Sequence, residues 1–249
     1  MSKLRICALG SSFASGPGIL PREYRPAGRS ANNYAHLLAA ELDAELTDLT
    51  CSGATLLNVL NTPQTTFFFY HFEPQLDGVP SDADIVTLTA GGNDLGYSYQ
   101  MMKDSVWGSA QQVAEPTISG EDLTKRFIEV VDAIKQKAPK ATVYLIDYIP
   151  IFGDLTQTGR DTPLSEAQIK NFRAMADQLS ASFRDAAQAR PESVLLSPGD
   201  WCKGHEVGSE DPWAVGFQWS MLVGRGGIPY HPNAAAHRAI AEELLKLIK

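Results

Sequence analysis

Short apolar segments alternate with longer amphipathic segments along the chain. Five segments of strand length are rich in apolar residues, and several are apolar at almost every position: residues 4–9, 45–49, 85–89, 142–146 and 193–196. A strand that is apolar on both faces is typical of a parallel sheet covered by helices on both sides. The pattern therefore predicts one buried, five-stranded parallel sheet.

Amphipathic helices are expected between and after these strands. Apolar side chains fall on one helical face in residues 123–137 and 164–189, and again in a last helix from about residue 233 to residue 248. Thr162 and Pro163 are interpreted as the N-cap and first residue of the middle helix. The alternation predicts an α/β fold made of a single domain over residues 1–249.

Two long segments lack a regular pattern, residues 61–78 and 197–230, and both contain many aromatic residues. The first holds the cluster at residues 67–72, and the second holds Trp201, Trp213, Phe217 and Trp219. Irregular segments of this length in a compact domain are often lids or binding loops. Their aromatic side chains either cap the core or form an apolar wall for a substrate.

Composition narrows the classes of partner. Hydrophobic residues make up 44% of the chain and charged residues 20%, which is typical of a globular protein. The net charge of -8 argues against nucleic acid or an anionic membrane as partner. No apolar run is long enough to span a bilayer, and a strand-like segment follows Met1 almost at once, so a cytoplasmic location is expected, with secretion as the alternative.

Ligands of parallel α/β sheets bind beyond the carboxyl ends of the strands, so the chemistry is expected just after each strand. Four short blocks stand there or before the last helix, and they contain Ser12, Gly53, Asn93 and His231. Ser12 follows Gly10 on a tight turn, where a serine could act as a nucleophile. The glycine spacing around it fits neither a phosphate-binding loop nor a dinucleotide fingerprint.

The other three blocks each allow a structural role beside a chemical one. The glycine at position 53 would let a backbone N–H approach a ligand, or Ser52 would cap a helix. Asn93 after Gly91-Gly92 would donate to an oxyanion or cap the next helix. His231 lies just before the last helix, which would anchor its imidazole near a rigid element, or it is an ordinary loop residue.

Taken together, the order and spacing of these four blocks resemble the SGNH hydrolases, also called GDSL-type lipases and esterases. The resemblance covers nearly the whole chain and implies a flavodoxin-like, three-layer α/β/α sandwich. It implies that Ser12 is the nucleophile and His231 the base. It also implies that the N–H groups of Ser12 and Gly53 and the side-chain amide of Asn93 form an oxyanion hole. The substrate would be a small-molecule ester, and no metal or organic cofactor is needed.

Two positions depart from the family pattern. Ser11 stands where the first block usually has Asp, and Ile228 stands three residues before His231, where the triad Asp normally lies. A backbone carbonyl within residues 227–230 is the favoured replacement for that Asp. The alternatives are a carboxylate from the preceding loop, or poor catalysis. The candidate carboxylates are Glu206, Glu210 and Asp211.

The sequence therefore predicts a serine esterase that works through an acyl-enzyme with a Ser-His dyad. A weak or inactive binding protein on the same scaffold is one alternative, and a long-chain lipase or acyltransferase is another. Cys202 and His205 provide only two potential metal ligands, which do not make a site. His237 is expected to be a surface or structural residue, and the sequence indicates no partner for His36 or His71.

Overall fold

A five-stranded parallel sheet forms the centre of the computed structural model, which describes residues 3–66, 68–108, 115–223 and 227–248. The spatial order of the strands is β4-β1-β7-β8-β9. Their bounds are β1 (Arg5–Gly10), β4 (Glu45–Asp48), β7 (Ile85–Thr89), β8 (Thr142–Ile146) and β9 (Ser193–Leu196). Numbered along the chain, the order is 2-1-3-4-5, which is the flavodoxin-like arrangement. The predicted fold class and strands are confirmed.

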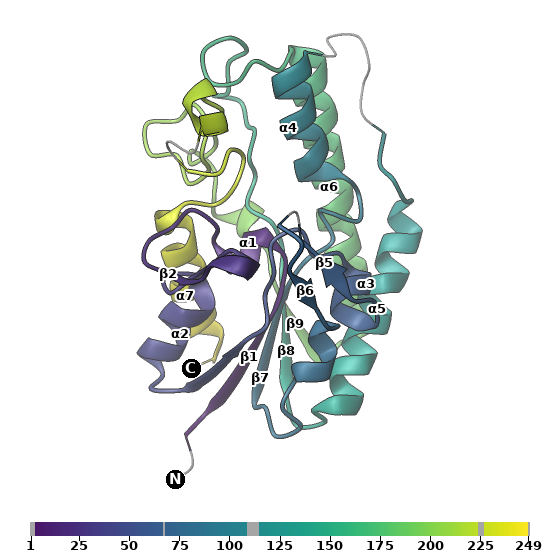
Figure 1. Cartoon of the computed structure of the whole chain (residues 1–249). Coiled ribbons are helices and arrows are strands. Elements are labelled where there is room, and N and C mark those ends of the chain that lie inside the picture. Colours follow the sequence, from purple (N-terminus) through teal and green to yellow (C-terminus); the bar gives the residue numbers. More distant parts are fainter. Residues whose placement is uncertain (1–2, 67, 109–114, 224–226, 249) are drawn as a thin grey trace.

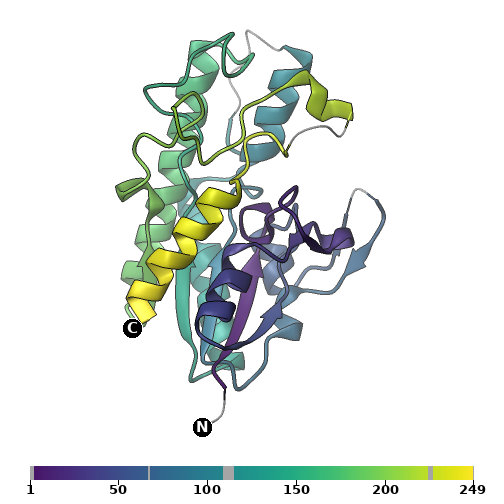
Figure 2. The ribbon, with the colours of Figure 1, turned by 90° about the vertical axis from the view of Figure 1, so that its left-hand side faces the viewer.

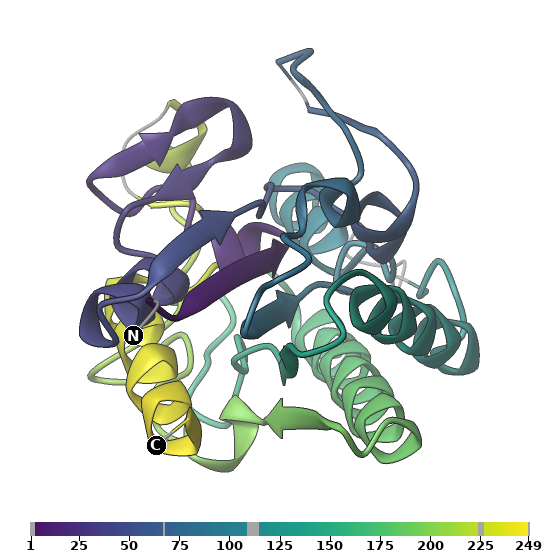
Figure 3. The same cartoon turned by 90° about the horizontal axis from the view of Figure 1, so that it is seen from below.

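Helices cover both faces of the sheet (Figures 1 and 3). One layer contains α2 (Tyr34–Glu41) and α7 (Ala234–Ile248), which pack against each other. The opposite layer contains α3 (Leu56–Leu60), α5 (Gly120–Lys137) and α6 (Glu166–Ala189). α4 (Tyr97–Trp107) packs against α6 above the sheet in the view of Figure 1. The apolar stripes read from the sequence are the buried faces of α5 and α6.

The start of α6 differs from the expectation. The N-cap is Ser165 and not Thr162, because Ser165 and Gln168 form a reciprocal capping box at that point. The hydroxyl of Thr162 instead lies 2.7 Å from the hydroxyl of Tyr230. Ser52 is not a helix cap either, since the N-cap of α3 is Thr55, which forms a capping box with Asn58.

The remaining elements are short. They are α1 (Ser12–Ser15), β2 (Arg22–Tyr24), η1 (Arg25–Ala27), β3 (Arg29–Ser30), β5 (Gln64–Thr65), β6 (His71–Phe72), η2 (Gln75–Gly78), η3 (Pro198–Asp200) and η4 (Trp219–Val223). β2 pairs with β3 and β5 with β6, both antiparallel. The β5–β6 hairpin stands away from the body of the molecule (Figures 2 and 3). Among the described residues, no helix combines the length and the apolar character needed to cross a membrane.

The aromatic residues of the two irregular segments separate into a buried and an exposed group. Phe68 and Phe69, at the tip of the β5–β6 hairpin, are 75% and 88% exposed, so they do not cap the core. Trp219 is also exposed, whereas Phe217 is buried and Trp213 packs against the core. Phe67 lies outside the described residues.

Candidate active site

The turn that carries Ser12 is fixed over the end of β7. Gly10 has a φ of +140°, and a Cβ at this position would collide with the carbonyl oxygen of Thr89, so glycine is required. The Ser11 N–H donates to the same carbonyl at 2.9 Å. α1 therefore begins at Ser12 directly above the carboxyl ends of β1 and β7 (Figure 1).

Ser12 and His231 meet although they lie near opposite ends of the chain. The Oγ of Ser12 is 2.8 Å from Nε2 of His231, which is hydrogen-bond distance. Both residues are largely buried, with exposed fractions of 6% and 7%. The ring of Phe13 lies against the imidazole, with 5.2 Å between the ring centroids.

The other imidazole nitrogen faces a backbone carbonyl. Nδ1 of His231 lies 2.8 Å from the carbonyl oxygen of Pro229, which can only accept a hydrogen bond. This contact requires that Nδ1 carries the proton and that Nε2 presents its lone pair to Ser12. The group that faces Nδ1 thus lies within the 227–230 stretch where a carbonyl was expected.

Tyr230 shapes the turn between that carbonyl and the imidazole. Its φ is +58°, a left-handed conformation that an aromatic residue rarely adopts. Its hydroxyl lies 2.7 Å from the hydroxyls of both Ser105 and Thr162, and its N–H donates to Val215 at 2.7 Å. The side chain is fully buried, so these contacts hold the unusual turn in place.

The candidate carboxylates of the preceding loop are engaged elsewhere. Glu206 accepts hydrogen bonds from the N–H groups of Gly204 and Leu155. Asp211 lies 3.3 Å from the imidazole of His205, and Glu210 is exposed. Ile228, which stands at the usual position of the triad Asp, is 40% exposed.

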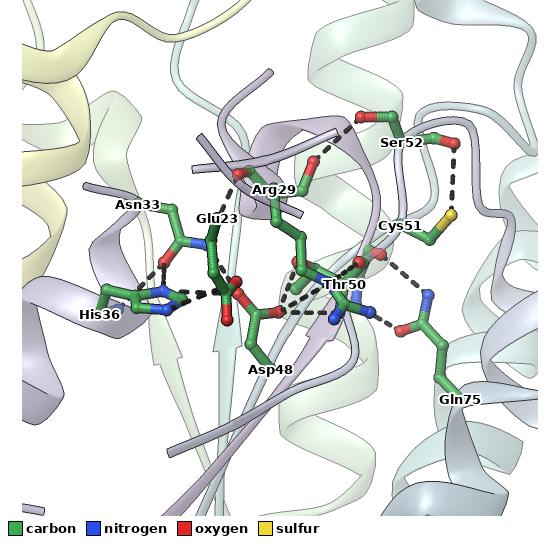
Figure 4. A network of polar contacts seen from close by, with 11 residues as sticks. Glu23, Arg29, Asn33, His36, Asp48, Thr50, Cys51, Ser52 and Gln75 are labelled. Carbon is green, nitrogen blue, oxygen red and sulfur yellow. Dashed lines mark hydrogen bonds and ion pairs between the residues drawn. The ribbon is translucent and has the colours of Figure 1, made fainter. Parts of the chain in front are cut away.

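The block with Gly53 is held against the turn that carries Ser12 by a polar network (Figure 4). Asp48 accepts from the N–H and hydroxyl of Thr50, and Arg29 donates to the Thr50 carbonyl at 2.6 Å. Gln75 forms hydrogen bonds with both the N–H and the carbonyl of Gly10. This network fixes the end of β4 beside the end of β1, which brings the residues around position 53 to the site.

The block with Asn93 is tied to three other elements. The side-chain amide of Asn93 donates to the Ala54 carbonyl at 2.8 Å, which uses one of its two hydrogens. Asp94 accepts from the Leu56 N–H and from Arg126, both within 3 Å. Burial nevertheless raises the pKa of Asp94, and these contacts oppose the rise.

Tyr148, which follows β8, contacts the Ser12 turn although no sequence pattern predicts it. Its hydroxyl lies 2.8 Å from the Ser11 hydroxyl and accepts a longer hydrogen bond, 3.3 Å, from the Gly92 N–H. Its ring stacks on Phe13 at 4.1 Å between centroids. A Cβ at Gly92 would lie 2.7 Å from this ring, so the glycine is needed for the close approach. No sequence motif signals such a contact, because its members come from three separate strand ends.

Burial dominates the electrostatics of the two buried histidines. It lowers the pKa of His231, and the hydrogen bond to Pro229 partly offsets that effect. It lowers the pKa of His237 to about 3, with a further contribution from the proximity of His231. Both rings are therefore neutral at pH 7. His237 accepts a hydrogen bond from the Tyr34 N–H, as a structural residue would.

In the parts of the chain that the structure describes, one group of side chains is close enough together to suggest a metal site: Glu23, His36 and Asp48. Asp48 already accepts from Thr50 and from the Asn33 amide, and Arg29 lies 3.7 Å away. Because these donors already bond to both carboxylate oxygens of Asp48, we assign Asp48 to the support of the site (Figure 4).

The chain is similar to known lipases. The chain is 28% identical over 262 residues to Lipase 2 of Streptomyces coelicolor, covering 97% of this chain and 84% of that protein. It is 30% identical over 239 residues to Lipase 1 of the same organism, covering 92% and 80%.

Two solved structures share the fold. They are phospholipase A1 from Streptomyces albidoflavus, with a TM-score of 0.74 at 23% identity, and an extracellular lipase from Streptomyces rimosus, with a TM-score of 0.74 at 24% identity. The first comparison covers 97% of this chain and 99% of the other, and the second covers 98% and 99%.

The sequence also matches the GDSL-like Lipase/Acylhydrolase family over residues 8–239, which includes all four blocks. The chain therefore belongs to the GDSL-like lipase/acylhydrolase family and is a carboxylic ester hydrolase.

Proposed function

We propose that the chain hydrolyses carboxylic esters through an acyl-enzyme on Ser12, with His231 as the base and the Pro229 carbonyl in place of the triad Asp. One observation carries the proposal. Two hydrogen bonds of 2.8 Å run without a break from the Ser12 hydroxyl, through the imidazole, to the Pro229 carbonyl oxygen. This is the orientation that a serine nucleophile and its base require.

The reaction would proceed in two halves. Ser12 Oγ attacks the ester carbonyl while its proton moves to Nε2 of His231, which gives a tetrahedral intermediate. The C–O bond to the alcohol then breaks, and the alcohol leaves with the proton from Nε2. Water attacks the acyl-enzyme in the same way, with His231 as base, and Ser12 is released with its proton restored.

The oxyanion would be held by the N–H groups of Ser12 and Gly53 and by the Asn93 amide. The Asn93 hydrogen that does not bond to Ala54 is the one assigned to this role. Each donor of this kind contributes about 10²–10³ in rate. The Gly92 N–H and the Ser11 hydroxyl both contact Tyr148, which keeps the Asn93 block in register with the nucleophile turn.

A neutral carbonyl supplies only part of what a carboxylate supplies. It fixes the tautomer of His231, and loss of the correct tautomer is what costs about 10⁴ in turnover in the serine-protease template. It lacks the negative charge that stabilises the imidazolium formed during the reaction. The dyad should therefore be active but slower than a complete triad at equal oxyanion stabilisation.

The preferred length of the acyl chain distinguishes a lipase from a short-chain esterase. The relatives are named lipases, and the exposed Phe68 and Phe69 offer apolar surface on the β5–β6 hairpin. A lipase would keep its rate with long p-nitrophenyl esters, whereas a short-chain esterase would lose it steeply beyond about four carbons. The same series of substrates, with an added alcohol acceptor, measures acyl transfer against hydrolysis.

The variant Ser12→Ala tests the proposal directly. We expect its hydrolysis of p-nitrophenyl butyrate to fall by about 10³-fold or more, because the nucleophile and its partner act as a unit. A phosphonate ester should add its mass to the wild-type protein and not to the variant. Ser81→Ala, at an exposed serine, is the matched control. Equal activity in Ser12→Ala and wild type would overturn the acyl-enzyme mechanism.

A further inference from the structure

Three side chains with metal-binding atoms meet where β2, α2 and the end of β4 come together (Figure 4). Glu23 belongs to β2, His36 belongs to α2, and Asp48 is the last residue of β4. One nitrogen of His36 and one carboxylate oxygen of each of the other two residues lie within 4.8 Å of one another. The reaction proposed for Ser12 does not involve Glu23 or His36.

The hydrogen bonds of Asn33 determine which nitrogen of His36 can bind a metal. The amide of Asn33 is held in one orientation, because its Nδ2 donates to Asp48 at 2.8 Å and its Oδ1 accepts from the His36 N–H at 3.0 Å. This Oδ1 also lies 3.0 Å from Nδ1 of His36 and can only accept, so Nδ1 carries a proton. A histidine that binds a metal usually donates its other ring N–H to an oxygen in this way. The contact leaves Nε2 as the nitrogen that can bind a metal.

Nε2 of His36 faces the carboxylate of Glu23 at 3.5 Å. In the neutral ring, Nε2 presents a lone pair to an oxygen that has only lone pairs, so a proton or a metal ion is needed between them. The distance is longer than a direct N–H···O hydrogen bond. It matches the separation of two ligand atoms on a tetrahedral zinc ion, about 3.3–3.6 Å for bonds of about 2.0–2.2 Å. The geometry therefore favours a metal ion over a shared proton.

Asp48 is placed to supply the third ligand atom. Its side chain is 2% exposed, and its Oδ2 lies 3.5 Å from the imidazole. Oδ1 accepts both hydrogen bonds of Thr50, whereas the Asn33 amide takes one of the two lone pairs of Oδ2. Carboxylates that bind metals are commonly hydrogen-bonded as well, so these contacts orient Asp48 and do not exclude a metal. Arg29, which lies 3.7 Å from Oδ1, balances one of the two carboxylate charges, and a cation would balance the other.

We propose that Glu23, His36 and Asp48 bind a zinc ion through Nε2 of the imidazole and one oxygen of each carboxylate, with water as the fourth ligand. One imidazole beside two carboxylates suits zinc, whereas Ca²⁺ and Mg²⁺ prefer sites made of oxygen atoms alone. The Glu23 side chain is 41% exposed, which leaves the ion a path from solvent. The ion would fasten the short β2–β3 sheet to α2 and β4, a role that goes beyond the proposed reaction and does not depend on turnover.

Calorimetry with zinc chloride on the untagged, chelator-treated chain tests the binding. We expect about one zinc ion per chain, and we expect Glu23→Gln and His36→Gln each to weaken binding about tenfold or more. The control variants are His71→Gln and Glu73→Gln. These two exposed residues form a pair with the same 3.5 Å separation, but among the described residues they have no third ligand beside them. The controls should bind zinc like the wild type. Zinc binding that both Glu23→Gln and His36→Gln retain unchanged would overturn the proposal, as would calcium binding as tight as that of zinc.

Thermal melts test the same site by its effect on stability. Zinc at about 100 times its dissociation constant should raise the melting temperature of the wild type by about 5 °C or more, and a chelator should reverse the rise. His36→Gln should melt at the same temperature with and without zinc, and its melt without zinc shows that it is folded. An equal rise in the wild type and in His36→Gln would contradict the site. Absence of zinc binding by the wild type at about 100 µM would also contradict it, since a proton would then lie between His36 and Glu23.

Discussion

At the scale of single residues, the site depends on a turn that its own sequence disfavours. A left-handed φ at a residue such as Tyr230 costs on the order of 1–3 kcal/mol. The hydroxyl contacts of Tyr230 with Ser105 and Thr162 offset this cost, and the turn directs the Pro229 carbonyl at Nδ1 of His231. In the proposed mechanism, this backbone group takes the place where the family usually has a carboxylate.

The pH dependence of kcat/KM is a residue-scale prediction. In the proposed mechanism His231 acts as a base only when it is neutral, and burial lowers its pKa below the ordinary value of 6.5. Activity should therefore rise with pH through a midpoint below 6.5 and be constant above it, up to the pH where the ester hydrolyses on its own. The measurement is kcat/KM for p-nitrophenyl butyrate between pH 4 and 8. A midpoint above 6.5 would show that a negative group, and not a carbonyl, faces the imidazole.

At the scale of elements, Tyr148 connects strand ends that are remote in sequence. Its ring and hydroxyl contact the turn around Ser12 after β1 and the glycine turn after β7, while its own backbone follows β8. The hydroxyl is fully buried, which raises its pKa and keeps it a neutral hydrogen-bonding group. Such a group sets relative position without entering the chemistry.

Replacement of this hydroxyl should affect turnover more than substrate binding. We expect Tyr148→Phe to lower kcat about tenfold with little change in KM, because small displacements of reacting groups are costly. The stability loss should be on the order of 1 kcal/mol for the lost hydrogen bonds. Tyr144→Phe, which removes a hydroxyl from β8 itself, is the control for stability. Steady-state kinetics and thermal melts are the measurements, and an unchanged kcat in Tyr148→Phe would refute the positioning role.

At the scale of the whole molecule, the buried residue His237 connects α7, at the end of the chain, to α2. His237 on α7 accepts a hydrogen bond from the first residue of α2, Tyr34, and stacks on its ring. Among the described residues its Nε2 has no hydrogen-bond partner, so protonation would place an unpaired charge in the core.

This burial predicts that the protein loses stability in acid. The unfolded chain binds a proton at His237 below its ordinary pKa of 6.5, whereas the folded chain resists protonation until about pH 3. The contribution of His237 to the free energy of unfolding should be constant above pH 6.5. Below pH 6.5 it should fall by about 1.4 kcal/mol per pH unit. Urea unfolding between pH 4 and 7 measures the slope.

The variant His237→Gln should reduce the slope of unfolding free energy against pH by the contribution of about one bound proton. The control variant His71→Gln, at an exposed histidine on β6, should not reduce it. The lowered pKa of His231 acts in the same direction, so part of the slope should remain in His237→Gln. An identical slope in the wild type and in His237→Gln would contradict the assignment.

The cytoplasmic location stays a prediction of the sequence, and the S. rimosus protein with the same fold is described as extracellular.

The sequence by itself determined the sheet, the layers and the segments that meet at the site. Apolar strands buried on both faces leave only a covered parallel sheet, and the polar blocks after β1, β4 and β7 must then lie at one edge. Sequence signals for the ends of helices were less reliable. The predicted N-cap of α6 was Thr162, whereas the actual N-cap is Ser165, another hydroxyl residue three positions later.

Only the tertiary structure decided what orients His231, because a backbone carbonyl is present at every residue and leaves no mark in the sequence. The same holds for the contact of Tyr148 with Ser11. Each of these depends on the distance between side chains or backbone groups from separate elements. That distance is set by how the layers pack and by the backbone angles of a few turns, and no local pattern encodes it.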